Sequence, residues 1–147
     1  RARPPAALAL GADGINMGSR FMCTVESCIH DNVKQAIVDG DERGTELIFR
    51  SLHNTARVAS NAVSREVVQI LRDGGKFSDV KDLVAGVRGR RVFDDGDIDA
   101  GIWTVGTAMG LINDVPTVGD LVSRIVTEAE DLISGRLAAM VAEKSAV

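Results

Sequence analysis

A glycine-rich stretch near the start of the chain carries the residues best suited to bind a charged ligand. It reads GADGINMGSRF, residues 11–21, with a short apolar core between glycines, then Gly18 and Ser19, then a run with helical spacing. Glycine lets backbone N–H groups point outward, and the start of a helix adds unpaired N–H groups and the positive end of a dipole. The stretch suits a phosphate group, and a tight strand-to-helix turn without a ligand is the alternative.

The rest of the sequence holds little that could perform catalysis or bind a metal. Cys23 and Cys28 lack the CxxC spacing of redox and metal motifs, so we expect two reduced, half-buried thiols. His30 and His53 are expected to be exposed or hydrogen-bonded, without a catalytic role. Because no nucleophile triad, metal cluster or carboxylate pair with acid–base spacing is evident, the sequence assigns no catalytic residue and no metal site.

The elements expected next to the turn are a strand before it and a helix after it. Residues 6–10 predict the end of a helix that stops at Gly11, and residues 14–17 predict a short buried strand. Apolar residues then recur at helical spacing, which predicts a helix over residues 24–38 that begins near Thr24.

The remaining elements are expected to be mostly helical. Helices are predicted at residues 62–72 and 79–87, residues 45–49 fit a strand, and residues 50–61 are expected to be loop with a helical turn. The charged run at 88–97 is expected to be a solvated loop whose arginines and aspartates compensate each other.

The C-terminal third of the chain contains a glycine-punctuated segment and the clearest helix. Glycines within residues 101–112 would let the backbone approach another group closely. Thr117 and Asp120 fit a capping box at the start of the longest helix. Its continuous apolar stripe, from Val118 to Met140, predicts packing against a large surface.

Composition limits the partners that the chain can have. Its 147 residues suffice for a domain with a core, and its net charge of −4 argues against a nucleic-acid surface. No apolar run approaches the roughly 18 residues of a membrane span, and no signal-peptide core is evident. We therefore expect a cytoplasmic protein without membrane or nucleic-acid partners.

Three segments resemble the nitronate monooxygenase family, formerly called 2-nitropropane dioxygenases. AALALGADGINMGSRFMCTVES looks like the family's eighth-strand segment, and GIWTVGTAMGLINDVPTVGDLVSRIVTEAE is similar to its C-terminal signature. NTARVASN resembles the region where an Arg and an Asn precede a family helix. The resemblance runs from about Ala6 to about Glu130.

The resemblance implies an FMN-dependent TIM-barrel enzyme that oxidises alkyl nitronates with molecular oxygen. Gly18 and Ser19 match the family's Gly-Thr pair, whose backbone N–H groups and hydroxyl hold the FMN phosphate. Met17 and Arg20 flank that pair and are included in the expected cofactor site. The family's catalytic histidine lies upstream and is matched by neither histidine here, and Thr107 stands where the family often has Gln after a glycine.

A complete (β/α)₈ barrel needs about 250 residues, so the expected fold class is α/β, the C-terminal portion of such a barrel. Residues 1–147 would form a single segment containing strand eight as one short parallel strand, the phosphate-binding turn and the C-terminal helices. We expect the isolated chain to be inactive, and its partners to be a small-molecule substrate and either further copies of itself or a complementing N-terminal barrel segment. The alternatives are an FMN- and NAD(P)H-dependent enoyl-thioester reductase of the same superfamily, or a non-catalytic helical association module.

Overall fold

The computed structural model describes residues 6–7 and 9–142, and the chain divides into two compact units. The terminal unit joins residues 1–17 to residues 116–147. The inserted unit is the continuous stretch 18–115, which lies between those two segments in the chain. In sequence, therefore, the inserted unit interrupts the terminal unit directly after the predicted strand and before the last long helix.

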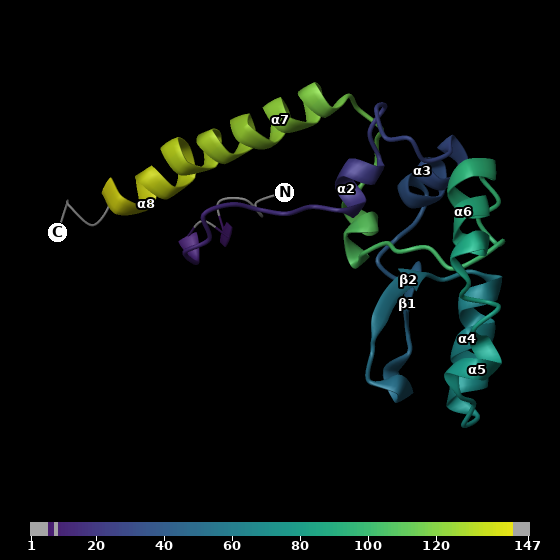
Figure 1. The fold of residues 1–147 in the computed structure, drawn as a ribbon. Helices are drawn as coiled ribbons and strands as arrows, with labels where there is room; N and C mark the ends of the chain where they lie inside the picture. Colours follow the sequence, from purple (N-terminus) through teal and green to yellow (C-terminus); the bar gives the residue numbers. More distant parts are fainter. Residues whose placement is uncertain (1–5, 8, 143–147) are drawn as a thin grey trace. The chain divides into compact units, whose positions relative to one another are not determined.

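The inserted unit consists of short helices and a small β-hairpin, which lies beside α4 and α5 (Figure 1). Strands β1 (Thr45–Ile48) and β2 (Ala56–Ala59) pair antiparallel, with Thr45 opposite Ala59 and Ile48 opposite Ala56. The helices, in chain order, are α2 (Ser19–Met22), α3 (Asp31–Val38), η1 (Arg50–Leu52), α4 (Ala62–Arg72), α5 (Phe77–Val80), α6 (Gly86–Asp95) and η2 (Thr107–Leu111).

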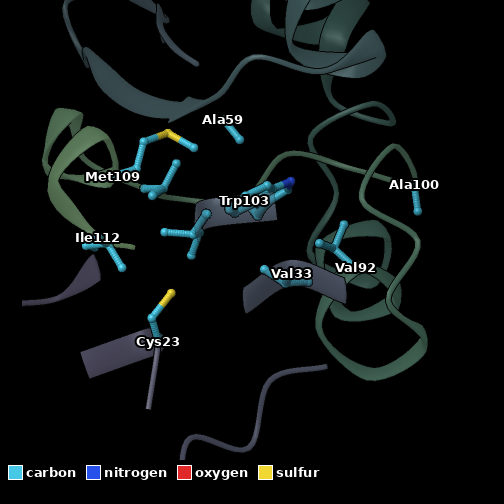
Figure 2. Close-up of a cluster of buried hydrophobic side chains, with 10 residues drawn as sticks. Cys23, Val33, Ala59, Val92, Ala100, Trp103, Met109 and Ile112 are labelled. Carbon is cyan, nitrogen blue, oxygen red and sulfur yellow. The ribbon is translucent and has the colours of Figure 1, made fainter. Parts of the chain in front are cut away.

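Two apolar clusters hold the inserted unit together. The first brings α3, α6 and the segment around η2 together, and its buried residues are Cys23, Val33, Ile37, Ala59, Val92, Ala100, Trp103, Val105, Met109 and Ile112 (Figure 2). The second joins the hairpin to α4 and α5 through Ile48, Val58, Val63, Val67, Leu71 and Val80. The four-residue spacing of Val63, Val67 and Leu71 places them on one face of α4, so the predicted helix at residues 62–72 is confirmed.

A buried polar network fixes the start of α4. The Asn61 side chain accepts the Ser64 N–H at 2.8 Å, and its amide donates to the carbonyls of Ile98 at 2.7 Å and Gly101 at 2.8 Å. The Ser64 hydroxyl in turn donates to the Glu46 carboxylate at 2.6 Å. Asn61 therefore ties α4 to a loop almost forty residues later, while Ser64 ties the same helix to β1.

The terminal unit contains the longest helix. Thr117 caps it by accepting the Asp120 N–H at 3.1 Å, which confirms the predicted start. Helix α7 (Val118–Asp131) continues through η3 (Leu132–Leu137), a π-helical turn, into α8 (Ala138–Ala142) (Figure 1). Five apolar residues on this helix, called the apolar stripe below, are exposed: Val122, Val126, Ile133, Leu137 and Met140.

At the other end of the terminal unit, the predicted helix end before Gly11 is confirmed. Ala6, Ala7 and Ala9 are helical, and the N–H groups of Leu10 and Ala12 reach back to the carbonyls of Ala6 and Ala7 at 3.1 Å. Gly11 has a φ of +90°, the left-handed geometry that favours glycine after a helix.

The predicted strand at residues 14–17 does not form in this chain. The segment has no regular secondary structure, and Gly14, Ile15 and Asn16 are exposed. A parallel strand obtains its hydrogen bonds and its burial from neighbouring strands. Among the described residues β1 and β2 pair with each other and Val58 of β2 also bridges Thr104, but no strand pairs with residues 14–17.

Several helix boundaries also differ from the prediction. The helix expected to begin near Thr24 and run over residues 24–38 begins only at Asp31, where His30 caps α3, and residues 24–30 are turns and irregular structure. The Thr24 hydroxyl donates to the Phe21 carbonyl at 2.9 Å, directly after the separate short helix α2. Residues 86–95, expected to begin as helix and continue as a charged loop, form α6 throughout, because Val92 is fully buried and anchors the run. The loop expected over residues 50–61 contains η1 as its helical turn, and also the unpredicted strand β2.

No helix in the described part of the chain is both long enough and apolar enough to pass through a membrane.

Candidate functional site

The turn at Gly18 is open, and its glycine has no structural explanation within the described residues. Gly18 caps α2 with φ −82° and ψ −72°, a conformation that any residue can adopt. A Cβ added at Gly18 would meet no atom within 4 Å. Since neither the backbone nor the packing described here requires glycine at this position, the space beside it suits a group that approaches the backbone closely.

Backbone donors are available at the same turn. The first hydrogen bonds of α2 run from the N–H groups of Phe21 and Met22 to the Gly18 carbonyl, at 3.0 and 3.1 Å. The N–H groups of Ser19 and Arg20 precede these bonds and have no acceptor among the residues that the structure describes. The turn therefore offers two donors beside an open glycine.

The Ser19 hydroxyl links this turn to the glycine-punctuated segment near the C-terminus. Its oxygen accepts the Gly106 N–H at 2.9 Å, immediately before η2 begins at Thr107. A hydroxyl that accepts one bond still has its own proton to donate. The structure thus brings the two glycine motifs of the sequence together within the inserted unit, and Ser19 retains a donor.

The Arg20 side chain is largely buried and paired within the inserted unit. Its Nη1 lies 3.0 Å from the Asp114 carboxylate, and its Nη2 donates to the carbonyls of Asp114 at 3.1 Å and Cys23 at 3.2 Å. Its Nε is buried with no hydrogen-bond partner in the described structure. The two terminal nitrogens of the guanidinium are therefore bound to protein acceptors, and among the described residues Nε has none.

The remaining candidate residues have different surroundings. Met17, the fourth predicted site residue, is half-buried and ends the first segment of the terminal unit. His30 caps α3 by accepting the Asn32 N–H at 3.1 Å, and its ring lies against Gly96. His53 is exposed with a φ of 54° after η1. In the described ranges no group of three or more histidine, cysteine, aspartate or glutamate side chains could hold a metal ion.

The two cysteines are not alike, so the expectation of two half-buried thiols is wrong. Both are free, but Cys23 is fully buried in the first apolar cluster and Cys28 is exposed. Burial raises the pKa of the Cys23 thiol, and the nearby cations Arg20 and Lys34 offset part of that rise. Cys23 is thus a core residue beside the Arg20 pair.

Sequence reasoning did not identify Gly106 and Asp114 as partners of the turn. Gly106 lies in the segment whose glycines were expected to allow close approach, and its partner proves to be Ser19. Asp114 lies in the sequence GLINDVP, where an acidic residue before proline gives a weak signal on its own. Both contacts span most of the inserted unit, so local patterns could not reveal them.

Comparisons with known proteins match this chain to curated enzymes named for two different activities. The chain is 26% identical over 160 residues to a Mycobacterium tuberculosis (3aS,4S,5R,7aS)-5-hydroxy-7a-methyl-1-oxo-octahydro-1H-indene-4-carboxyl-CoA dehydrogenase, covering 84% of this chain and 45% of that protein. It is 27% identical over 136 residues to a Neurospora crassa nitronate monooxygenase, covering 86% of this chain and 34% of that protein. The chain thus spans less than half the length of these curated relatives.

A solved structure and a family model also match this chain. FabK from Thermotoga maritima matches 92% of this chain and 42% of its own, with a TM-score of 0.84 and 28% identity. This confirms the predicted fold class, the C-terminal portion of a (β/α)₈ barrel, although the strand expected at residues 14–17 is not formed. The family model described as nitronate monooxygenase matches residues 5–128. Because that match covers most of the sequence, the chain belongs to the nitronate monooxygenase family.

Proposed function

We propose that this chain supplies the phosphate-binding part of a cytoplasmic, FMN-dependent oxidoreductase of the nitronate monooxygenase type, which oxidises alkyl nitronates with molecular oxygen. The family match and the Neurospora crassa relative support this reaction class. The observation that carries the proposal is the open space beside Gly18, where no described neighbour and no backbone constraint accounts for glycine. FMN, when bound, would supply the electron transfer between substrate and oxygen.

The donor set at the turn fits an anionic phosphate. The N–H groups of Ser19 and Arg20 have no acceptor among the described residues, and the Ser19 hydroxyl has a proton to donate. An excess of donors over acceptors is what a phosphate requires, because all its exposed oxygens accept hydrogen bonds. We place Gly18 and Ser19 against the phosphate, with Met17 and Arg20 flanking them.

The rest of the barrel is proposed to come from a complementing N-terminal barrel segment. The matched proteins extend well beyond the part that this chain covers, and the apolar stripe of α7 and α8 is exposed. In this proposal residues 1–147 form one segment of the barrel, containing strand eight, the phosphate-binding turn and the C-terminal helices. The complementing segment would provide the catalytic base and the walls of the flavin and substrate sites, and the assembly of the two is called the assembled barrel below.

A second candidate is an FMN- and NAD(P)H-dependent enoyl-thioester reductase. It is favoured by the Mycobacterium tuberculosis relative, whose name describes a dehydrogenase of a CoA thioester. Steady-state assays of the assembled barrel with an alkyl nitronate and with an enoyl-CoA separate the two reactions. A chain that binds its barrel partner but supports neither reaction and no FMN would instead be a non-catalytic association module.

The proposed phosphate site is tested by replacing Gly18 with valine in the assembled barrel. Gly18→Val should nearly abolish FMN retention after desalting, because a branched side chain blocks close approach to the backbone. Gly86→Val is the matched control: Gly86 also begins a helix, and a Cβ there also meets nothing within 4 Å. Unchanged flavin content in Gly18→Val would exclude this turn as the phosphate site.

The Ser19 hydroxyl is tested separately by FMN titration. Ser19→Ala should weaken FMN binding by about 0.5–3 kcal/mol, the range for one hydrogen bond including those to charged groups. Ser19→Thr keeps the hydroxyl and should bind FMN nearly as the parent does. Equal dissociation constants for the parent and Ser19→Ala would show that the hydroxyl does not contact the phosphate.

A further inference from the structure

Two neighbouring side chains of α2 hold the two sides of η2. Ser19 accepts the Gly106 N–H just before η2, and Arg20 pairs with Asp114 in the segment just after it. Arg20 and Asp114 are 94 residues apart in sequence, and the Arg20 side chain is only 14% exposed. The Ser19–Gly106 and Arg20–Asp114 contacts, together called the brace below, therefore hold the Gly18 turn against a segment that is remote in the chain.

The Arg20 guanidinium makes three contacts that only a planar, forked cation can make together. One nitrogen pairs with the Asp114 carboxylate, and the other reaches the carbonyls of Asp114 and Cys23. The Cys23 carbonyl lies directly after α2, so the same side chain also fixes the C-terminal end of that helix. A lysine could supply the charge but not this set of contacts.

We propose that Arg20 and Asp114 are positioning residues for the proposed FMN site: their ion pair holds the Gly18–Ser19 turn in place, and neither charge contacts the phosphate. This inference rests on the function proposed above. The Arg20 charge is already compensated by a carboxylate at 3.0 Å, whereas the N–H groups of Ser19 and Arg20 have no acceptor in the part of the chain that the structure describes. Phosphate affinity then depends on how well these N–H donors are preorganised, and the Arg20–Asp114 ion pair keeps them in position.

The decisive variant is Asp114→Asn, because the two possible roles of Arg20 predict opposite results. It preserves the shape of the side chain but removes the charge that engages the guanidinium. If the pair positions the turn, the FMN dissociation constant of the assembled barrel should rise by about tenfold, as for other supporting residues around a bound group. If Arg20 instead binds the phosphate through its charge, freeing it from Asp114 should leave FMN affinity unchanged or increase it, which would overturn the proposal.

Two further variants complete the comparison of FMN dissociation constants. Arg20→Lys should also raise the dissociation constant about tenfold, because the charge remains while the fork is lost. Asp97→Asn is the matched control, since Asp97 pairs with Arg91 at 3.3 Å on an exposed part of the same unit and should leave FMN affinity unchanged. An Arg20→Lys variant with parental affinity would overturn the positioning role.

Amide hydrogen exchange at Gly106 tests the brace without any flavin. In Asp114→Asn the Gly106 N–H should exchange about tenfold faster than in the parent chain, because loosening Arg20 also loosens its neighbour Ser19. Exchange at the parental rate would overturn the brace even if FMN binds. Faster exchange in Asp114→Asn, combined with a parent that never binds FMN, would support the role of the ion pair and count only against the proposed function.

Discussion

At the scale of single residues, the two free thiols should differ sharply in reactivity. Cys28 is exposed, whereas Cys23 is buried and its thiol has a pKa raised by burial. Alkylation by iodoacetamide at neutral pH should therefore modify Cys28 at least about a hundredfold faster, since Cys23 needs both local opening and ionisation. Mass spectrometry of Cys23→Ser and Cys28→Ser variants assigns each rate, and comparable rates would contradict the buried position of Cys23.

The raised pKa of Cys23 also gives stability a pH dependence. The folded chain keeps this thiol proton to a higher pH than the unfolded chain, so the unfolded state binds fewer protons once an ordinary thiol ionises. The contribution is fully present below that pH, and stability should fall as pH rises through the folded pKa. Urea unfolding at increasing alkaline pH should show this decline in the parent, and Cys23→Ala should reduce it while Cys28→Ala should not.

At the scale of elements, two capping residues should differ in their effect on stability. Asn61 is buried and bonds to Ser64 and to two loop carbonyls, whereas Thr117 is an exposed cap. Asn61→Ala should lower the free energy of unfolding by about 3 kcal/mol because it leaves buried groups unpaired, and Thr117→Ala by about 1 kcal/mol. Urea denaturation of each variant measures both, and a loss below that of Thr117→Ala would show that the Asn61 network does not support the fold.

The elements that the sequence predicted well are those whose stability is local. Residues 62–72 were predicted as the whole of α4, and Thr117 as the cap of α7, because caps and four-residue apolar spacing lie within the helix itself. Strand β2 escaped prediction because its pairing with β1 depends on a partner across a loop. The segment 14–17 was predicted as a strand from its apolar residues, but a parallel strand needs neighbours that the described residues do not supply.

In the candidate site, too, the residues identified by local sequence were predicted, and those that depend on distant contacts were not. Gly18 and Ser19 could be proposed from their own sequence, because a phosphate turn uses consecutive residues. Their supports at Gly106 and Asp114 could not, because those contacts close only when the inserted unit folds.

At the scale of the whole molecule, the apolar stripe should matter only in the assembled barrel. Val126 is 48% exposed in this chain, so Val126→Asp should change its unfolding free energy by less than about 0.5 kcal/mol. In the assembled barrel the same change should prevent association, because it buries an unpaired charge. Thr127→Asp, at an exposed neighbouring position, is the control; sedimentation velocity measures association, and equal behaviour of both variants would exclude the stripe as the contact surface.

The isolated chain should bind FMN weakly or not at all, because the proposal leaves the walls of the flavin site to the complementing segment. An FMN fluorescence titration should therefore show no saturation for these 147 residues and saturation for the assembled barrel. Tight, stoichiometric binding by the isolated chain would contradict the need for a complementing segment.

The contact between Arg20 and Asp114 also makes the inserted unit separable. The two residues lie close to the two ends of the stretch 18–115, so the chain enters and leaves this unit at neighbouring points. The stretch 18–115 is in this respect like a long loop whose two ends are held close together. The entropic cost of bringing the ends of a loop together grows only slowly with the number of residues in it. Insertions, deletions or replacements inside the inserted unit should therefore disturb the terminal unit little, as for inserted domains whose termini lie close together. In nitronate monooxygenase relatives, this region is where we expect the largest variation in length.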